Sequence, residues 1–217
     1  LPAFLLDVHA AAATLALETG LRSCQFVLTA HRDAFWPLAH KAASTRDQGF
    51  SNMFDLTGKT ALVTGATGGI GAAIARTFHK AGASVAISGR QVEKLEALKA
   101  ELGGDRVQVV PCDLGDRAQV QKLIDEATKA LGGRLDILVN NAGLTKDNLF
   151  MVMKDEQWDD VIAVNLTSTF MLCRAATRAL LRNKTGYGRI INIASVSGVF
   201  GNPGQGNYAA SKAGMVG

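Results

Sequence analysis

Residues 64–71 read Thr-Gly-Ala-Thr-Gly-Gly-Ile-Gly and lie between an apolar run, Lys59 to Val63, and a helical apolar pattern, Ile70 to Ala81. The glycines therefore occupy a predicted strand-to-helix turn. Such a turn lets a pyrophosphate approach the backbone and aims the amides of the helix N-terminus at its charge. A plain tight turn is the alternative. The flanking strand and helix favour a dinucleotide site, with contacts from Gly65, Thr67, Gly68, Gly69, Ile70 and Gly71.

Strand and helix patterns alternate along the chain beyond this turn. Strands are predicted over residues 84–88, 107–110, 137–140 and 189–194, and helices over 92–102, 117–131, 155–181 and from Tyr208 onward. The strands are nearly continuous apolar runs, which are typical of a parallel sheet covered on both faces. The predicted fold class is α/β, a doubly wound parallel sheet of the Rossmann type.

Composition excludes several other classes of protein. The chain has 217 residues, 47% of them hydrophobic and 19% charged, with a formal net charge of +4. Disorder and a membrane-spanning helix are excluded, and with no run of like charges we expect neither a nucleic acid nor a membrane partner. Three cysteines without a Cys-x-x-Cys pair favour a reducing compartment, so we expect a cytoplasmic protein.

The chain divides near residue 53. Residues 1–52 show no sustained period and end in a polar stretch, Arg46 to Asn52, whereas a strand pattern follows closely after Met53. We expect residues 53–217 to form the reductase domain of Rossmann type. Residues 1–52 form an N-terminal extension, which is either an upstream translation or a loosely helical appendage.

The ends of the next strands carry further candidates for dinucleotide binding. Ser88-Gly89-Arg90 ends the second strand without the carboxylate typical of NAD sites, so Arg90 favours the 2′-phosphate of NADPH over NADH. A solvated arginine is the alternative. Asp113 could accept from the adenine amino group, Leu114 beside it is a further candidate for cofactor contact, and the turn of Asn141, Ala142 and Gly143 could pack against the cofactor. These are also ordinary turn residues.

Tyr208 and Lys212 are spaced to share one face of a helix, because residues four apart lie one turn above each other. A positive charge beside a phenol stabilises the phenolate, so this pair predicts a proton donor for a carbonyl oxygen. Ser195 follows the fifth strand, and a glycine-rich loop could bring its hydroxyl to the same oxygen. Ser197 ranks second. Asn165, in a predicted helix interior, either holds a water on the proton path or caps or kinks the helix.

Together these motifs resemble the short-chain dehydrogenase/reductase family from about Leu56 to Gly217. The resemblance implies that Ser195 orients the carbonyl and that Tyr208 is the acid. Lys212 would then modulate Tyr208 and bind the ribose, and Asn165 would hold a water. The reaction that the resemblance implies requires no metal.

Residues 141–155 and 201–208 are similar to those of the 3-oxoacyl-[acyl-carrier-protein] reductases. That similarity implies NADPH-dependent reduction of a 3-oxoacyl thioester in fatty acid biosynthesis, with acyl carrier protein as the partner. Basic candidates for receiving this acidic partner are Arg178, Arg182, Lys184 and Arg189. The alternatives are a reductase of acetoacetyl-coenzyme A or another small ketone, a catalytically silent nucleotide-binding regulator, and a methyltransferase, which leaves Tyr208 and Lys212 unexplained.

Members of this family continue beyond the tyrosine helix with two more strands, a substrate lid and helices of a tetramer interface. The resemblance therefore implies a fragment that is incomplete at the C-terminal edge of its sheet, from a protein that is a homotetramer at full length. We expect an exposed apolar edge at the fifth strand and no activity from these 217 residues alone.

Overall fold

Five parallel strands form the centre of the molecule, in the order β3-β2-β1-β4-β5. The structure, a computed structural model, describes residues 54–183 and 185–217, so the predicted extension and its boundary lie outside the described residues. The predicted α/β class, a doubly wound parallel sheet, is confirmed. The strands are β1 (Thr60–Thr64), β2 (Ser84–Ser88), β3 (Val107–Val109), β4 (Ile137–Asn140) and β5 (Arg189–Asn192).

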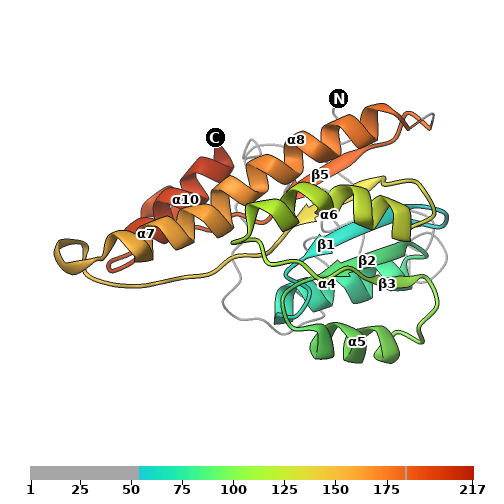
Figure 1. Cartoon of the computed structure of the whole chain (residues 1–217), viewed down its shortest axis with the longest axis horizontal. Coiled ribbons are helices and arrows are strands. Elements are labelled where there is room, and N and C mark those ends of the chain that lie inside the picture. The colour runs from blue at the N-terminus through green and yellow to red at the C-terminus, as the bar shows by residue number, and fades with distance from the viewer. Residues whose placement is uncertain (1–53, 184) are drawn as a thin grey trace, which may run out of the picture.

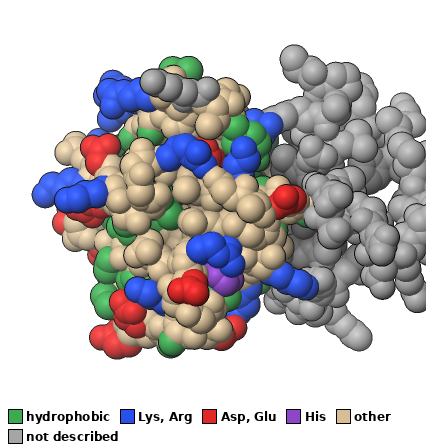
Figure 2. Space-filling model, turned by 90° about the vertical axis from the view of Figure 1, so that its right-hand side faces the viewer, with side chains coloured by type: hydrophobic (Ala, Val, Ile, Leu, Met, Phe, Trp, Pro, Cys, Tyr) green, Lys and Arg blue, Asp and Glu red, His purple; other side chains and the backbone are tan. Residues whose placement is uncertain are grey.

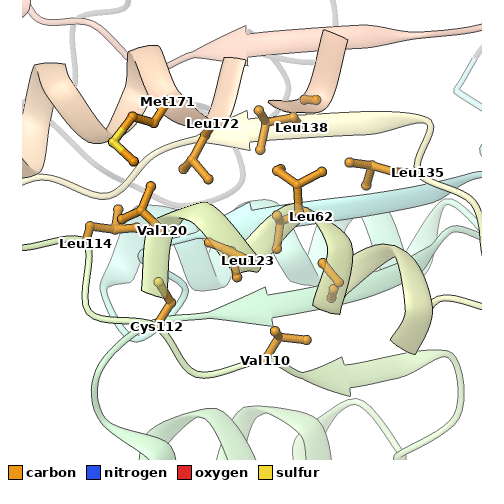
Figure 3. Packing of buried hydrophobic residues seen from close by; sticks show 14 residues of the cluster. Leu62, Val110, Cys112, Leu114, Val120, Leu123, Leu135, Leu138, Met171 and Leu172 are labelled. Carbon is orange, nitrogen blue, oxygen red and sulfur yellow. The ribbon is translucent and has the colours of Figure 1, made fainter. Parts of the chain in front are cut away.

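Helices cover both faces of this sheet (Figure 1). Apolar side chains of α4 (Gly69–Lys80) and α5 (Val92–Glu101) pack with Val63 and its neighbours on one face. On the other face, α6 (Arg117–Ala130) and α8 (Ser168–Leu181) pack against Leu62 and Leu138 (Figure 3). Because successive residues of a strand point to opposite faces and both faces are covered, all five residues of β1 are buried: the apolar Ala61, Leu62 and Val63 and the threonines at its two ends.

The direction in which successive strands are added to the sheet reverses between β1 and β4. The chain runs outward from β1 through β2 to β3, then crosses back so that β4 pairs with the other side of β1. In such sheets the loops at the carboxyl ends of the two central strands separate and leave room for a ligand. The turn of residues 65–68 and the turn that begins at Asn141 are these two loops.

The predicted helix over residues 155–181 is one helical stretch with a π-helical turn inside it. It consists of α7 (Asp155–Ile162), the π turn η3 (Ala163–Thr167) and α8. A short 3₁₀ turn, η2 (Phe150–Val152), precedes it. The π turn contains Asn165, which is consistent with the alternative that this residue alters the helix.

Two details near the end of the chain differ from the sequence prediction. β5 ends at Asn192 instead of Ala194, and the predicted glycine loop contains a short helix, α9 (Ser197–Phe200), before α10 (Gly206–Val216). Periodicity could not reveal α9, because four residues are too few to show a helical repeat and because this helix packs along α10.

The basic residues expected to receive an acidic partner lie away from the carboxyl ends of the strands. Arg189 is the first residue of β5, paired with the first residue of β4, and Arg178 and Arg182 lie at the end of α8 that precedes β5. Figure 2 looks onto this side of the molecule, where lysine and arginine side chains are scattered among acidic ones. Lys184 lies outside the described residues.

Within the described residues, no helix combines the length and the apolar character that are needed to cross a bilayer.

Candidate active site

The glycine turn packs tightly against the turn after β4. Gly65 has a φ of +66°, and a Cβ placed on it would lie 2.7 Å from the Cα of Ala142. The side-chain amide of Asn141 donates to the carbonyl oxygens of Thr64 (2.9 Å) and Gly65 (3.2 Å). Only glycine accommodates this backbone conformation and this contact together. The two predicted cofactor segments therefore form one continuous wall.

Thr64, which the sequence analysis did not single out, fixes the Asn141 turn against the end of β1. Its hydroxyl accepts from the amides of Asn141 (3.1 Å) and Ala142 (3.2 Å) and donates to the carbonyl of Val139 (3.2 Å). A threonine at the end of a strand carries no sequence signal for such a role. Its partners are more than seventy residues away in the chain, so only the sheet pairing reveals them.

The N-terminus of α4 has the properties of an anion site. Its N-cap residue, Gly68, offers no side chain to the free amides, and the first turn contains no acidic residue. Gly68 and Gly69 are exposed, and a Cβ on Gly69 would meet nothing within 4 Å. Free helix amides without a competing carboxylate bind phosphate groups. These residues fit the pyrophosphate of a dinucleotide.

Arg90 lies next to this anion site. The side chain of Thr67 packs over Gly89, where a Cβ would lie 3.0 Å from the threonine methyl carbon, and Arg90 follows with an exposed side chain. The amide of Cys112 donates to the Gly89 carbonyl (3.1 Å), which places Asp113 beside the same turn. Asp113 accepts from the Gly115 amide (2.9 Å), and Leu114 is buried in the core.

Tyr208 and Lys212 lie on one face of α10, as their spacing predicts. The Lys212 ammonium is 5.8 Å from the centroid of the Tyr208 ring. Lys212 is 3% exposed and donates to the carbonyl of Ile193 (2.7 Å), two residues before Ser195. Burial lowers the pKa of Lys212 to about 8. The lysine thus keeps a positive charge at neutral pH in a place shielded from solvent.

The two serine candidates differ in how their hydroxyls are bonded. The Ser197 hydroxyl is directed to the Gln205 side chain (3.4 Å), whereas the Ser195 oxygen accepts from the Ser197 amide (3.2 Å). Among the residues that the structure describes, no acceptor receives the Ser195 proton. Ser195 therefore has a hydrogen-bond donor to offer a ligand, which is consistent with its rank above Ser197.

Asn165 is fully buried, and its side chain bridges two segments. Its amide oxygen accepts from the Leu144 amide (2.8 Å), and its nitrogen donates to the Leu144 carbonyl (3.0 Å) and the Ser211 hydroxyl (3.0 Å). A Cβ on Gly143 would lie 3.3 Å from the Asn165 amide oxygen and 3.7 Å from the Lys212 ammonium. Gly143, Asn165 and Lys212 therefore meet. The water that Asn165 was expected to hold remains a prediction.

The structure thus brings the candidates to one edge of the sheet, at the carboxyl ends of the strands. The glycine turn, Arg90 and the Asn141 turn lie around the anion site, and the residues for proton transfer adjoin the Asn141 turn. This arrangement is typical of dinucleotide-binding α/β proteins of the Rossmann class, and the lysine–tyrosine pair lies at the same edge of the sheet as the candidate nucleotide site.

The chain belongs to the short chain dehydrogenase family. The model of this family matches residues 59–217. The chain is 58% identical over 165 residues to nodulation protein G of Rhizobium sp. (strain N33), covering 76% of this chain and 66% of that protein. It is 52% identical to the 3-oxoacyl-[acyl-carrier-protein] reductase of Rickettsia conorii, covering 76% of this chain and 65% of that protein.

A solved structure supports the fold assignment. A protein from Sinorhizobium meliloti 1021, assigned as a short-chain alcohol dehydrogenase, superposes with a TM-score of 0.70 at 36% identity, covering 75% of this chain and 64% of that one. The chain thus spans just under two thirds of the length of the relatives it matches.

Proposed function

We propose that the protein reduces a 3-oxoacyl thioester to the 3-hydroxyacyl thioester with NADPH, and that the thioester is carried by acyl carrier protein. The observation that carries the proposal is the Lys212–Tyr208 pair, whose lysine donates to the Ile193 carbonyl two residues before Ser195, at the same edge of the sheet as an anion site. Reduction of a ketone needs hydrogen-bond donors for the ketone oxygen, which the hydroxyls of Ser195 and Tyr208 can supply, and the buried Lys212 cation can stabilise the phenolate that forms.

The cofactor site is assigned from the residues that surround the anion site. The amides at the start of α4 would bind the pyrophosphate, and Arg90 would bind the 2′-phosphate through a charge-assisted hydrogen bond. Asp113 would accept from the adenine amino group, the Asn141–Gly143 turn would pack on the cofactor, and Lys212 would bind its ribose. When bound, NADPH supplies a hydride.

The protein's own groups would manage the proton. The Ser195 hydroxyl would donate to the ketone oxygen and orient it, and the Tyr208 hydroxyl would transfer its proton to that oxygen as negative charge develops there. Lys212 would stabilise the resulting phenolate, which it can do while its ammonium is protonated. Because burial lowers the pKa of Lys212 to about 8, this help should fade as the pH rises above that value.

The substrate class follows from the similarity to 3-oxoacyl-[acyl-carrier-protein] reductases, one of which is 52% identical. The relatives at 58% and 56% identity are named nodulation protein G, so the carrier needs a direct test. A coenzyme A thioester is the alternative. We propose further that the full-length protein is a homotetramer in the cytoplasm and serves fatty acid synthesis.

The experiment is an assay of the protein at its full natural length with a short 3-oxoacyl group on acyl carrier protein and on coenzyme A. We expect NADPH oxidation with the carrier-protein substrate. Tyr208→Phe should lower kcat by about 10²- to 10⁴-fold, because it removes the proton donor, while NADPH binding measured by fluorescence is retained.

Either of two results contradicts the proposal. Tyr208→Phe could turn over as fast as the parent protein, or the parent could bind NADPH and reduce neither thioester.

A further inference from the structure

Both backbone groups of Tyr208 are held by buried side chains. Its N–H donates to the amide oxygen of Asn207 (2.7 Å), and its carbonyl accepts from the hydroxyl of Ser211 (2.7 Å). Asn207 and Ser211 are both fully buried. An N–H group in the first turn of a helix has no acceptor within the helix, so the contact from Asn207 supplies the partner that the Tyr208 N–H would otherwise lack. The backbone of Tyr208 is therefore linked through Asn207 and Ser211 to whatever these two side chains bind in turn.

The side chain of Asn207 links the start of α10 to two other segments. Its amide nitrogen donates to the carbonyl of Lys146 (2.9 Å), in the loop after β4, and to the carbonyl of Gln157 (3.0 Å), in α7. Both N–H groups of the amide and its oxygen are thus used. A buried amide with all its groups paired has one favourable orientation, because rotating it would leave several groups unpaired.

These contacts connect Tyr208 to the wall of the nucleotide site. Lys146 follows closely after the Asn141–Gly143 turn, which packs on the glycine turn. On the other side, Ser211 accepts from Asn165, whose side chain is bonded to Leu144 in the same loop. The loop after β4 is therefore linked to α10 on both sides of Tyr208, directly at Asn207 and through Asn165 at Ser211.

We propose that Asn207 is a positioning residue, which sets the location of the Tyr208 hydroxyl relative to the nucleotide wall. This inference rests on the proposed function for its effect on turnover, but its effect on Tyr208 itself can be measured without turnover. Misplacing a reacting group by about 1 Å can cost about 100-fold in rate.

The test uses the fact that the chain has only two tyrosines, Tyr187 and Tyr208. In a Tyr187→Phe background of the 217-residue chain with 3-fluorotyrosine incorporated, Tyr208 gives the single fluorine resonance. We expect Asn207→Ala to shift or broaden this resonance. Asn207→Ser, which keeps one donor, should give a smaller change and serves if the alanine variant does not fold.

Asn183→Ala is the matched control. Asn183 is a partly buried asparagine whose amide donates to the Leu135 carbonyl, at the opposite edge of the sheet. Its loss should lower the urea midpoint of unfolding and leave the Tyr208 resonance in place. In the full-length protein, Asn207→Ala should lower kcat by about 100-fold with the KM for NADPH within about twofold, and Asn183→Ala should change neither.

Asn207→Asp adds a pH signature that simple loss of stability would not produce. Its carboxylate would face the carbonyls of Lys146 and Gln157, whereas its protonated form can donate to one of them. The deficit in kcat relative to the parent should therefore shrink as the pH is lowered.

The inference is overturned if Asn207→Ala and Asn207→Ser leave the fluorine resonance where Asn183→Ala leaves it. If the parent reduces no thioester, the proposed function fails, and the fluorine resonance alone decides the role of Asn207.

Discussion

At the scale of single residues, Lys212 shows a conflict between stability and chemistry. Its ammonium is buried among protein groups, with the Ile193 carbonyl as its oxygen partner. Burial disfavours the charged form, which is why the pKa of Lys212 falls to about 8 from its ordinary value of 10.5. A residue selected only for packing would be apolar here.

We expect Lys212→Met to stabilise the nucleotide-free protein at pH 7. Lowering the pKa by about two and a half units corresponds to a cost of about 3 kcal/mol for the charged form. Loss of the hydrogen bond to Ile193 offsets about 1 kcal/mol of the gain. The free energy of unfolding, measured in urea, should therefore rise by about 1–3 kcal/mol.

The pH dependence checks the cause. Between pH 8 and 10.5 the unfolded chain binds more protons at Lys212 than the folded chain, so this lysine makes stability rise with pH in that window. Below pH 8 the lysine is protonated in both states and its full cost is present. The difference in stability between Lys212→Met and the parent should therefore shrink as the pH rises from 8 to 10.5. A methionine variant less stable than the parent at pH 7 would contradict this account.

At the scale of elements, the contact between α9 and α10 places Ser195 beside the tyrosine helix. A Cβ on Gly198 would lie 2.7 Å from the Ala213 nitrogen and 2.7 Å from the Lys212 carbonyl carbon, both backbone atoms of α10. The two helices can approach this closely only because residue 198 has no side chain. The short helix α9 thus fixes the end of the segment that begins at Ser195.

Gly198→Ala should push α9 away from α10. We expect a loss of about 1–3 kcal/mol in the free energy of unfolding, because backbone atoms cannot yield as side chains do. Ser195 should move with α9, so turnover of the full-length protein should fall more than NADPH affinity does.

Gly206→Ala is the control for this change. Its new methyl group would lie 3.4 Å from the Phe150 ring, an ordinary contact, and the change should alter stability by no more than about 1 kcal/mol. Equal effects of the two substitutions would show that the close contact at Gly198 is unimportant.

At the scale of the whole molecule, the amino ends and the carboxyl ends of the strands differ in how their polar groups are paired. At the amino edge, buried Asp136 accepts from the Thr60 amide (2.9 Å) and from Arg134 (3.0 Å), which ties the starts of β1 and β4 together. The carboxyl edge instead leaves helix amides, the Ser195 hydroxyl and Arg90 available. A ligand that binds this edge contacts several strands at once and should stabilise the entire fold.

Binding of NADPH should therefore raise the melting temperature. At a concentration 100 times its Kd, the ligand adds about 2.7 kcal/mol of stability. We expect Arg90→Ala to weaken NADPH binding by about tenfold and to reduce the thermal shift, while the smaller shift produced by NADH is unchanged.

Lys122→Ala, which removes an exposed charge from α6, is the control and should affect neither shift. If Arg90→Ala reduces the shifts with NADPH and NADH equally, Arg90 does not recognise the 2′-phosphate.

By itself, the sequence determined the order of the strands and helices, the doubly wound class and the main site candidates, because apolar periodicity and glycine spacing are local properties. Only the tertiary structure decided which of these residues meet. Thr64 bonds Asn141, and Asn207 bonds Lys146 and Gln157, across segments that are distant in the chain. Gly198, in a glycine-rich loop, packs against the backbone of α10. Such contacts depend on how elements pack, and a buried asparagine or glycine reads as an ordinary turn residue until its neighbours are known.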